Sequence, residues 1–122
     1  VGLKDDMQYM ADFYAACDVL ALTSDTECFA LVQVEAMLSG TPVVMTNTPG
    51  GRVPVQVTGM GALATVGDWR SIGEALVEVI RSREQYVKPR ADIERIFSFQ
   101  ETVDSYERLL TEYAVPERRH QE

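Results

Sequence analysis

The chain has 122 residues, of which 46% are hydrophobic and 25% charged, and 19 acidic residues outnumber 11 basic ones to give a net charge of −8. These values are typical of a single globular domain and argue against a disordered chain or a coiled coil. A protein of this charge repels polyanions, so neither nucleic acid nor an anionic membrane surface is expected as a partner. A small anion held by backbone amides at a helix terminus remains compatible with it.

The cysteine and histidine content limits metal and nucleophile chemistry. Cys17 and Cys28 are too few for a metal cluster and favour a reducing compartment over a secreted disulfide framework. His120 lies in the polar end ERRHQE, so neither Ser-His nor Cys-His catalysis is supported, and no metal site is expected. No apolar run reaches the ~20 residues of a membrane-spanning helix, and no signal peptide is visible. We expect a cytoplasmic protein and, because the sequence starts at Val1 rather than Met, a piece of a longer one.

The first part of the chain alternates helix and strand patterns. Residues 5–17 are predicted to form an amphipathic helix, since apolar side chains recur every three or four positions: Met7, Met10, Phe13, Tyr14 and Cys17. The run VLALT (19–23) is typical of a strand buried on both faces. Helix formers fill 30–39, where Gly40 and Pro42 supply the stop signal, and PVVMT (42–46) repeats the strand pattern.

The second part continues the alternation. NTPGGR (47–52) is a turn-rich loop, and 53–57 is predicted to be extended because Pro54 disfavours a helix. ALATV (62–66) is predicted as a third strand. Asp68 is the N-cap of a further helix, whose inward side chains are expected to be Ile72, Leu76, Val79 and Ile80. A short helical stretch with Ile93, Ile96 and Phe97 follows Pro89, and a last helix (100–113) has an apolar side formed by Val103, Tyr106, Leu109, Leu110 and Tyr113.

Strands of about five residues that alternate with helices predict an α/β fold, an open parallel sheet with helices on both faces. In such sheets ligands bind at the carboxyl ends of the strands, where the loops begin at Ser24, Asn47 and Gly67. If only three short strands are present, the core is small and a sheet edge is unpaired, so we expect this chain alone to be marginally stable or to aggregate.

Two glutamates lie at the first of these loops. Glu27 is in the strand-to-helix loop and Glu35 follows within the helix, between Val34 and Ala36. The helix N-terminus directs free N–H groups and a partial positive charge into the crevice. A buried carboxylate at position 35 needs a hydrogen-bonding partner, which ligand hydroxyls or protein donors would supply. Spacing alone leaves open the alternative that Glu35 faces solvent and that Glu27 is simply an acid favoured by the helix dipole.

The residues around the glutamates add a resemblance. Five stretches follow one another along the chain: Y-A-A-C-D-V-L-A-L-T-S, E-C-F-A-L-V-Q-V-E-A-M, S-G-T-P-V-V, P-G-G and G-D. Together they resemble the C-terminal nucleotide-sugar-binding domain of the family-4 retaining glycosyltransferases. The resemblance covers about residues 1–80, and beyond them only the helical character is shared. The resemblance implies a GT-B fold, in which two Rossmann-like domains face each other across a cleft. It divides the chain into part of the C-terminal Rossmann-like donor-binding domain (1–99), an amphipathic helix (100–114) and a polar tail (115–122).

The resemblance also assigns roles to residues. Glu27 matches the glutamate that contacts donor-sugar hydroxyls and is the candidate catalytic residue, and Glu35 matches the one that holds the nucleotide ribose. The stretch whose backbone amides approach the diphosphate corresponds to Phe29, Ala30 and Leu31, and the adjoining Cys28 is also a candidate donor-binding residue. Gly50 and Gly51 match a glycine pair near the donor, with a plain tight turn as the alternative. Arg52 is read either as a phosphate ligand or as a surface charge.

Two positions depart from the family pattern: Ala30 stands where the family usually has Gly, and Val55 where it often has Glu. The family's Arg and Lys for the leaving diphosphate fall before Val1, as does the acceptor domain, so this chain alone is expected to be inactive. The complete protein is expected to transfer a hexose, with retention, from a UDP-, GDP- or ADP-sugar to a glycan, lipid or small-molecule acceptor. It would use no cofactor, and the missing part could attach it peripherally to a membrane.

Two other classes of function stay open on the sequence. One is a non-catalytic α/β module that binds a nucleotide or a partner, although its functional aspartate should lie at a strand end and Asp18 is at the wrong end of its strand. The other is a GT-B relative such as a sugar epimerase or phosphorylase, whose catalytic groups would lie upstream.

Overall fold

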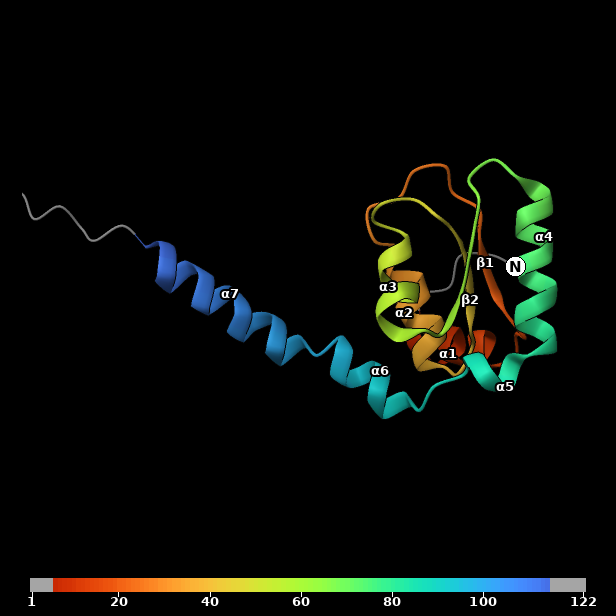
Figure 1. The fold of residues 1–122 in the computed structure, drawn as a ribbon. Helices are drawn as coiled ribbons and strands as arrows, with labels where there is room; N and C mark the ends of the chain where they lie inside the picture. Colours follow the sequence, from red (N-terminus) through yellow and green to blue (C-terminus); the bar gives the residue numbers. More distant parts are fainter. Residues whose placement is uncertain (1–5, 115–122) are drawn as a thin grey trace, which may run out of the picture.

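The computed structural model describes residues 6–114, which form a three-stranded parallel sheet with helices around it (Figure 1). The strand order is β1 (Leu20–Leu22), β2 (Val43–Thr46) and β3 (Gly61–Ala64). All four residues of β2 are buried, because this strand has a neighbour on each side and helices above and below. The expected open parallel α/β sheet is confirmed.

Helices cover both faces of the sheet. One face packs against α1 (Met7–Ala15), α2 (Leu31–Leu38), α3 (Arg52–Thr58) and α6 (Arg90–Ile96). The other packs against α4 (Trp69–Arg81), which the short helix α5 (Arg83–Tyr86) follows. Figure 1 shows α4 on one side of the sheet and α2 and α3 on the other. None of the described helices is long and apolar enough to cross a membrane.

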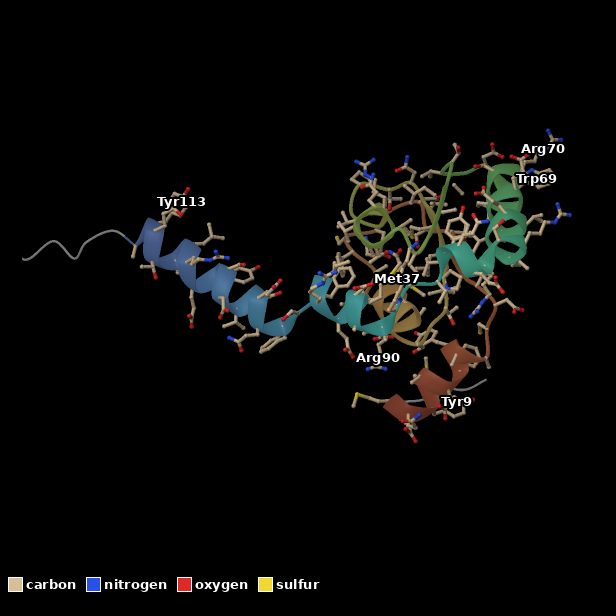
Figure 2. The ribbon with its side chains drawn as sticks, turned by 60° about the horizontal axis from the view of Figure 1, so that its bottom comes forward. Tyr9, Met37, Trp69, Arg70, Arg90 and Tyr113 are labelled. Carbon is tan, nitrogen blue, oxygen red and sulfur yellow. The ribbon has the colours of Figure 1, made fainter. Side chains whose placement is uncertain are left out.

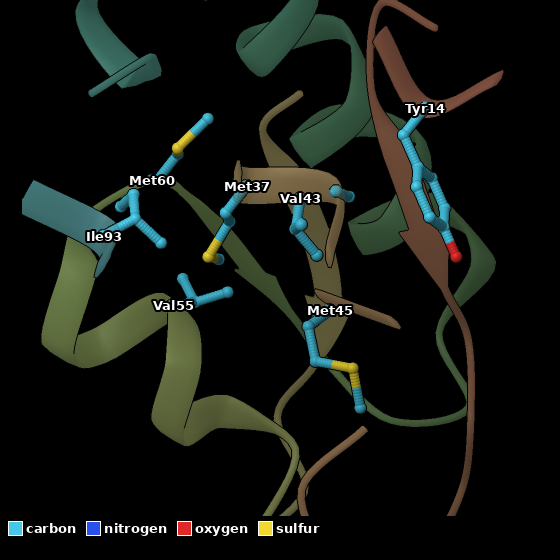
Figure 3. Packing of buried hydrophobic residues seen from close by; sticks show 8 residues of the cluster. Tyr14, Met37, Val43, Met45, Val55, Met60 and Ile93 are labelled. Carbon is cyan, nitrogen blue, oxygen red and sulfur yellow. The ribbon is translucent and has the colours of Figure 1, made fainter. Parts of the chain in front are cut away.

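The alternation of side chains along β2 divides the core in two. Val43 and Met45 point to the α1, α2, α3 and α6 face, where the fully buried Met37 lies among Val55, Met60 and Ile93 (Figure 3). Val44 points to the opposite face and packs with Val79 of α4. Unbranched methionines fill irregular gaps between the helices of the first face.

One predicted element was wrong. The segment 53–57 is not extended but lies within α3, and Pro54 is the third residue of that helix. The first four N–H groups of a helix have no partner within it, so a proline there removes no hydrogen bond. By contrast, the predicted N-cap is confirmed, because the Asp68 carboxylate accepts hydrogen bonds from the backbone N–H groups of Arg70 and Ser71 at the start of α4.

Some predicted inward positions are exposed. Met7 on α1 is 86% exposed and Ile80 on α4 is 49% exposed, whereas Ala75, which the apolar stripe of α4 did not include, is buried. The helical stripe identified the face of each helix, but helix ends that reach beyond the small sheet have nothing to pack against. The third strand also begins and ends earlier than predicted, at Gly61 and Ala64.

The last helix, α7 (Phe99–Tyr113), extends away from the body (Figure 1). None of its residues is buried, and Tyr113 stands far from the core residue Met37 in Figure 2. The predicted apolar stripe is therefore present but uncovered, with Tyr106 and Leu110 64% and 70% exposed. The predicted polar tail, 115–122, lies outside the described residues.

Candidate functional site

The loops that leave the carboxyl ends of the three strands gather at one end of the sheet, at the top of Figure 1. They are the β1–α2 loop (23–30), the β2–α3 loop (47–51) and the β3–α4 loop (65–68). This arrangement follows from parallel strands, whose carboxyl ends lie at the same edge. All the residues with predicted donor contacts except Leu31 and Glu35 lie in the first two loops.

The glycine pair brings these two loops into backbone contact. A Cβ atom on Gly50 would lie 1.8 Å from the carbonyl oxygen of Cys28 and 2.7 Å from that of Glu27. A Cβ on Gly51 would lie 2.2 Å from Cε of Met45. Neither glycine has a positive φ, so turn conformation does not require glycine at either position. Gly50 is required by the close approach of the β2–α3 loop to the backbone of the β1–α2 loop, whereas Gly51 leaves room for the Met45 and Thr48 side chains.

A buried side chain, Gln33 of α2, also joins the two loops. Its Nε2 donates to the carbonyl oxygen of Phe29 at 3.1 Å and to that of Gly51 at 2.8 Å. Thr46 at the end of β2 adds a further link, since its hydroxyl donates to the carbonyl of Ser24 at 2.5 Å. The sequence analysis missed Gln33, and the available signal was an amide at an otherwise apolar position of the run LVQVEAML.

The N-terminus of α2 is open towards this end of the sheet. Ala30 is its N-cap residue, with φ 59° and ψ 77°, and no side chain caps the helix. In the part of the chain that the structure describes, the backbone N–H groups from Phe29 to Val32 have no hydrogen-bond partner. These N–H groups and the helix dipole give the site a local positive potential despite the net negative charge of the chain.

The two glutamates occupy different surroundings. Glu27 is half-buried in the β1–α2 loop, and its Oε1 accepts a hydrogen bond from the Cys28 N–H at 2.9 Å. Glu35 is exposed on α2, yet its Oε2 accepts a hydrogen bond from the Tyr14 hydroxyl at 3.0 Å. The expectation that Glu35 has a hydrogen-bonding partner is confirmed, and of the two readings left open by the sequence the structure shows the exposed one. Among the described residues, no hydrogen bond joins the two glutamates: Glu27 lies in the β1–α2 loop, and Glu35 lines a pocket between α1 and α2.

Tyr14 is the partner that holds Glu35, and sequence reasoning placed it only in the core. Tyr14 is 6% exposed, and together with Glu35 it lines a pocket of 470 Å³ between α1 and α2, where Arg90 of α6 also lies. Burial raises the pKa of Tyr14, and the hydrogen bond to Glu35 and its negative charge raise it further. The phenol therefore stays protonated at neutral pH and leaves the other carboxylate oxygen of Glu35 available to a ligand.

Two other side chains lie at these loops. Arg52, read from the sequence as a phosphate ligand or a surface charge, spans its own loop by donating from Nη1 to Oδ1 of Asn47 at 3.3 Å. Trp69, which the sequence analysis did not single out, starts α4 and is 74% exposed, with the Arg70 guanidinium 5.1 Å from its ring centroid (Figure 2). Within residues 6–114, no group of three or more His, Cys, Asp or Glu side chains is placed to hold a metal ion.

Comparison with known proteins gives a family match over most of the chain. The family described as Glycosyl transferases group 1 matches residues 2–95. Among curated relatives, D-inositol 3-phosphate glycosyltransferases from Gordonia bronchialis and Mycolicibacterium smegmatis are 35% and 36% identical over 86% and 87% of the chain. N-acetyl-alpha-D-glucosaminyl L-malate synthase from Bacillus anthracis is 27% identical over 89% of the chain. The chain spans only about a quarter of the length of these relatives, 24% to 29%.

Solved structures show the same fold. Sucrose-phosphate synthase from Thermosynechococcus elongatus matches with a TM-score of 0.74 and 25% identity over 91% of the chain and 30% of its own. Anabaena HepE, solved in complex with UDP and glucose, matches with a TM-score of 0.74 and 26% identity over 92% of the chain and 31% of its own. The expected Rossmann-like sheet of a GT-B C-terminal domain is thereby confirmed.

Proposed function

The chain belongs to the Glycosyl transferases group 1 family, and from this premise we propose that it forms the donor site of a retaining hexosyltransferase. In the complete protein it binds a nucleoside diphosphate sugar, and the hexose passes to an acceptor hydroxyl with retention at the anomeric carbon. One observation carries the proposal: the unpartnered N–H groups at the start of α2 lie beside two glutamates and a second loop that glycines hold against the first.

The diphosphate lies at the N-terminus of α2 in this proposal. The free N–H groups of Phe29, Ala30 and Leu31 donate to phosphate oxygens, and the helix dipole favours the negative charge there. This short-range attraction is compatible with a chain whose net charge is −8. As the glycosidic bond breaks, negative charge grows on the leaving diphosphate, and donors fixed in advance stabilise it without rearrangement.

The glutamates orient the two sugars of the donor. Glu35, whose carboxylate the Tyr14 hydroxyl holds, accepts hydrogen bonds from the nucleotide ribose. Glu27 rotates from the Cys28 N–H towards hydroxyls of the transferred hexose, because its present hydrogen bond is local and readily exchanged. Fixing the donor in a reactive geometry lowers the entropic part of the barrier. Neither glutamate acts as a glycosidase-type acid or base in this proposal.

Other groups come from the rest of the complete protein, since this chain spans about a quarter of the relatives' length. These are the acceptor site for a glycan, lipid or small molecule, and further basic residues for the diphosphate. The donor is a substrate, and no cofactor or metal ion takes part in the proposed reaction. The chain on its own binds donor weakly and does not catalyse transfer.

The test is isothermal titration of the complete protein with UDP-, GDP- and ADP-sugars, followed by a transfer assay with the one that binds. We expect Glu35→Ala to weaken nucleotide and nucleotide sugar alike, and Glu27→Ala to weaken only the sugar-bearing ligand. Glu101→Ala, an exposed glutamate on the distant α7, is the matched control. If both site variants bind and transfer like the control, the proposed site is wrong.

A further inference from the structure

We propose that Gln33 is a positioning residue for the donor, which aims the Ala30 N–H at the diphosphate by holding the loops before α2 and α3 in one arrangement. Gln33 is completely buried and lies in the first turns of α2. It touches no donor group itself, so it acts through the peptide groups that it binds. The inference rests on the proposed function, because it assumes that the diphosphate lies at the start of α2.

The hydrogen bonds of Gln33 indicate why an amide stands at this position. Both Nε2 protons are used, one for the carbonyl of Phe29 at 3.1 Å and one for the carbonyl of Gly51 at 2.8 Å. These acceptors belong to loops that follow different strands. The Oε1 atom is buried without a partner among the described residues, which is costly. Packing alone would be served better by an apolar residue of similar size, so the two N–H donors are the reason for the amide.

The geometry of a peptide group links Gln33 to the donor side. The carbonyl of Phe29 and the N–H of Ala30 belong to one planar trans peptide, in which they point in opposite directions. Since the carbonyl points back to the buried Gln33, the Ala30 N–H points away from it, and this N–H has no protein partner. Gln33 therefore fixes the direction of a free donor at the helix N-terminus.

The conformation of Ala30 makes such a fixing interaction necessary. Its φ of 59° is the only positive value at a non-glycine residue in the described chain. Left-handed backbone is unfavourable for a residue with a Cβ atom, and it persists where surrounding contacts enforce it. The hydrogen bond to the preceding carbonyl and the close contact of Gly50 with Cys28 supply these contacts. Without Gln33 the peptide can rotate, and the N–H is no longer preorganised for phosphate.

The experiment compares a diphosphate with its nucleoside in the complete protein. UDP, GDP and ADP are titrated, and the tightest is then compared with the corresponding nucleoside, which lacks phosphates. Gln33→Met keeps the side-chain size but removes both hydrogen bonds, and Gln56→Met makes the same replacement at an exposed position of α3 as a control. We expect Gln33→Met to raise the Kd of the diphosphate roughly tenfold to a hundredfold, the effect of losing the one hydrogen bond from the Ala30 N–H to a charged phosphate. The Kd of the nucleoside should stay within about twofold, and neither ligand should respond to Gln56→Met.

Two results overturn the inference: an unchanged diphosphate Kd in folded Gln33→Met, or equal weakening of diphosphate and nucleoside, which a merely structural role would produce. If Gln33→Met does not fold, the inference is tested by a second measurement on the wild-type protein. Proton exchange at Gln33 Nε2, followed by NMR, should slow severalfold on saturation with the diphosphate, and no slowing overturns the inference. If the wild-type protein binds none of the three diphosphates, or if Glu35→Ala leaves their binding unchanged, the proposed function itself falls, and this inference with it.

Discussion

Replacing Gly50 with alanine tests the contact that joins the two loops of the site. The added Cβ would lie 1.8 Å from the carbonyl oxygen of Cys28, and the two backbones would have to separate by about 1.6 Å to reach an ordinary contact of 3.4 Å. Rotating a side chain cannot relieve this overlap, because the obstacle is backbone. We therefore expect Gly50→Ala to displace the β2–α3 loop from the β1–α2 loop.

The expected loss of stability can be worked from this geometry. Overpacking of a tight site costs about 1–3 kcal/mol, and a weakened bond from Gln33 to the neighbouring Gly51 adds about 0.5–1.5 kcal/mol. Alanine has fewer conformations in the unfolded chain, which offsets about 0.4–1 kcal/mol. The net loss should be about 0.5–4 kcal/mol, and each kcal/mol lowers the Tm of a domain of this size by about 3–6 °C.

The assay is thermal unfolding of the 122-residue chain followed by circular dichroism, with Gly73→Ala as the matched control. A Cβ atom on Gly73, within α4, would meet nothing within 4 Å, so the same replacement should raise stability there by about 0.5–1 kcal/mol. In the complete protein Gly50→Ala should also weaken nucleotide binding, and Gly73→Ala should not. A Gly50→Ala variant that melts at or above the wild-type temperature, beside a control that behaves as expected, would refute the reasoning.

Four further predictions concern the strained backbone, the buried phenol and the chain on its own. Ala30→Gly should raise the free energy of unfolding in urea by up to about 1.5 kcal/mol. It removes about 1–2 kcal/mol of left-handed strain, and the greater freedom of glycine in the unfolded chain takes back about 0.5–1 kcal/mol. A clear loss of stability would contradict the left-handed conformation. Tyr14→Phe should weaken nucleotide binding roughly threefold to tenfold by releasing Glu35, and binding equal to wild type would contradict that role. Because the pKa of Tyr14 is raised on folding, the phenol ionises first in the unfolded chain, and the free energy of unfolding should fall above about pH 10. Tyr14→Phe should lessen this fall, but only in part, since Tyr86 also has a raised pKa. Identical alkaline unfolding curves for the two proteins would contradict the prediction. The 122-residue chain alone should aggregate or melt below about 55 °C, because both outer strands have an open edge and the apolar side of α7 is uncovered. A cooperative melt above that temperature would contradict this expectation.

The parallel sheet was predictable because each strand is a short continuous apolar run between turn signals. VLALT and PVVMT became β1 and β2, and Asp68 capped α4 as its position before the apolar stripe indicated. The α3 segment was not predictable in this way, since Pro54 excludes a helix interior but is allowed in a first turn, and sequence alone does not say where the turn begins.

The candidate site was predictable only in part. The family pattern pointed to Glu27, Glu35 and the glycine pair, and the order of strands and loops placed most of them at one end of the sheet. It could not say that the hydroxyl of Tyr14 binds Glu35, because this contact joins two helices whose separation depends on how each packs on the sheet. Nor could it say that Gln33 faces inward, since a single amide in an apolar run fits either a buried or an exposed position.

By itself, the sequence determined the periodicities of strands and helices, the family, and the loops in which the candidate residues lie. These are local properties, because apolar spacing and turn residues act over a few neighbours along the chain. The tertiary structure alone decided that Gly50 serves a contact with Cys28, that Gln33 binds carbonyls on two loops, and that Ala30 is left-handed. Each of these depends on atoms that are distant in sequence or on contacts that enforce an unfavourable backbone, and only packing of the whole domain brings such atoms together.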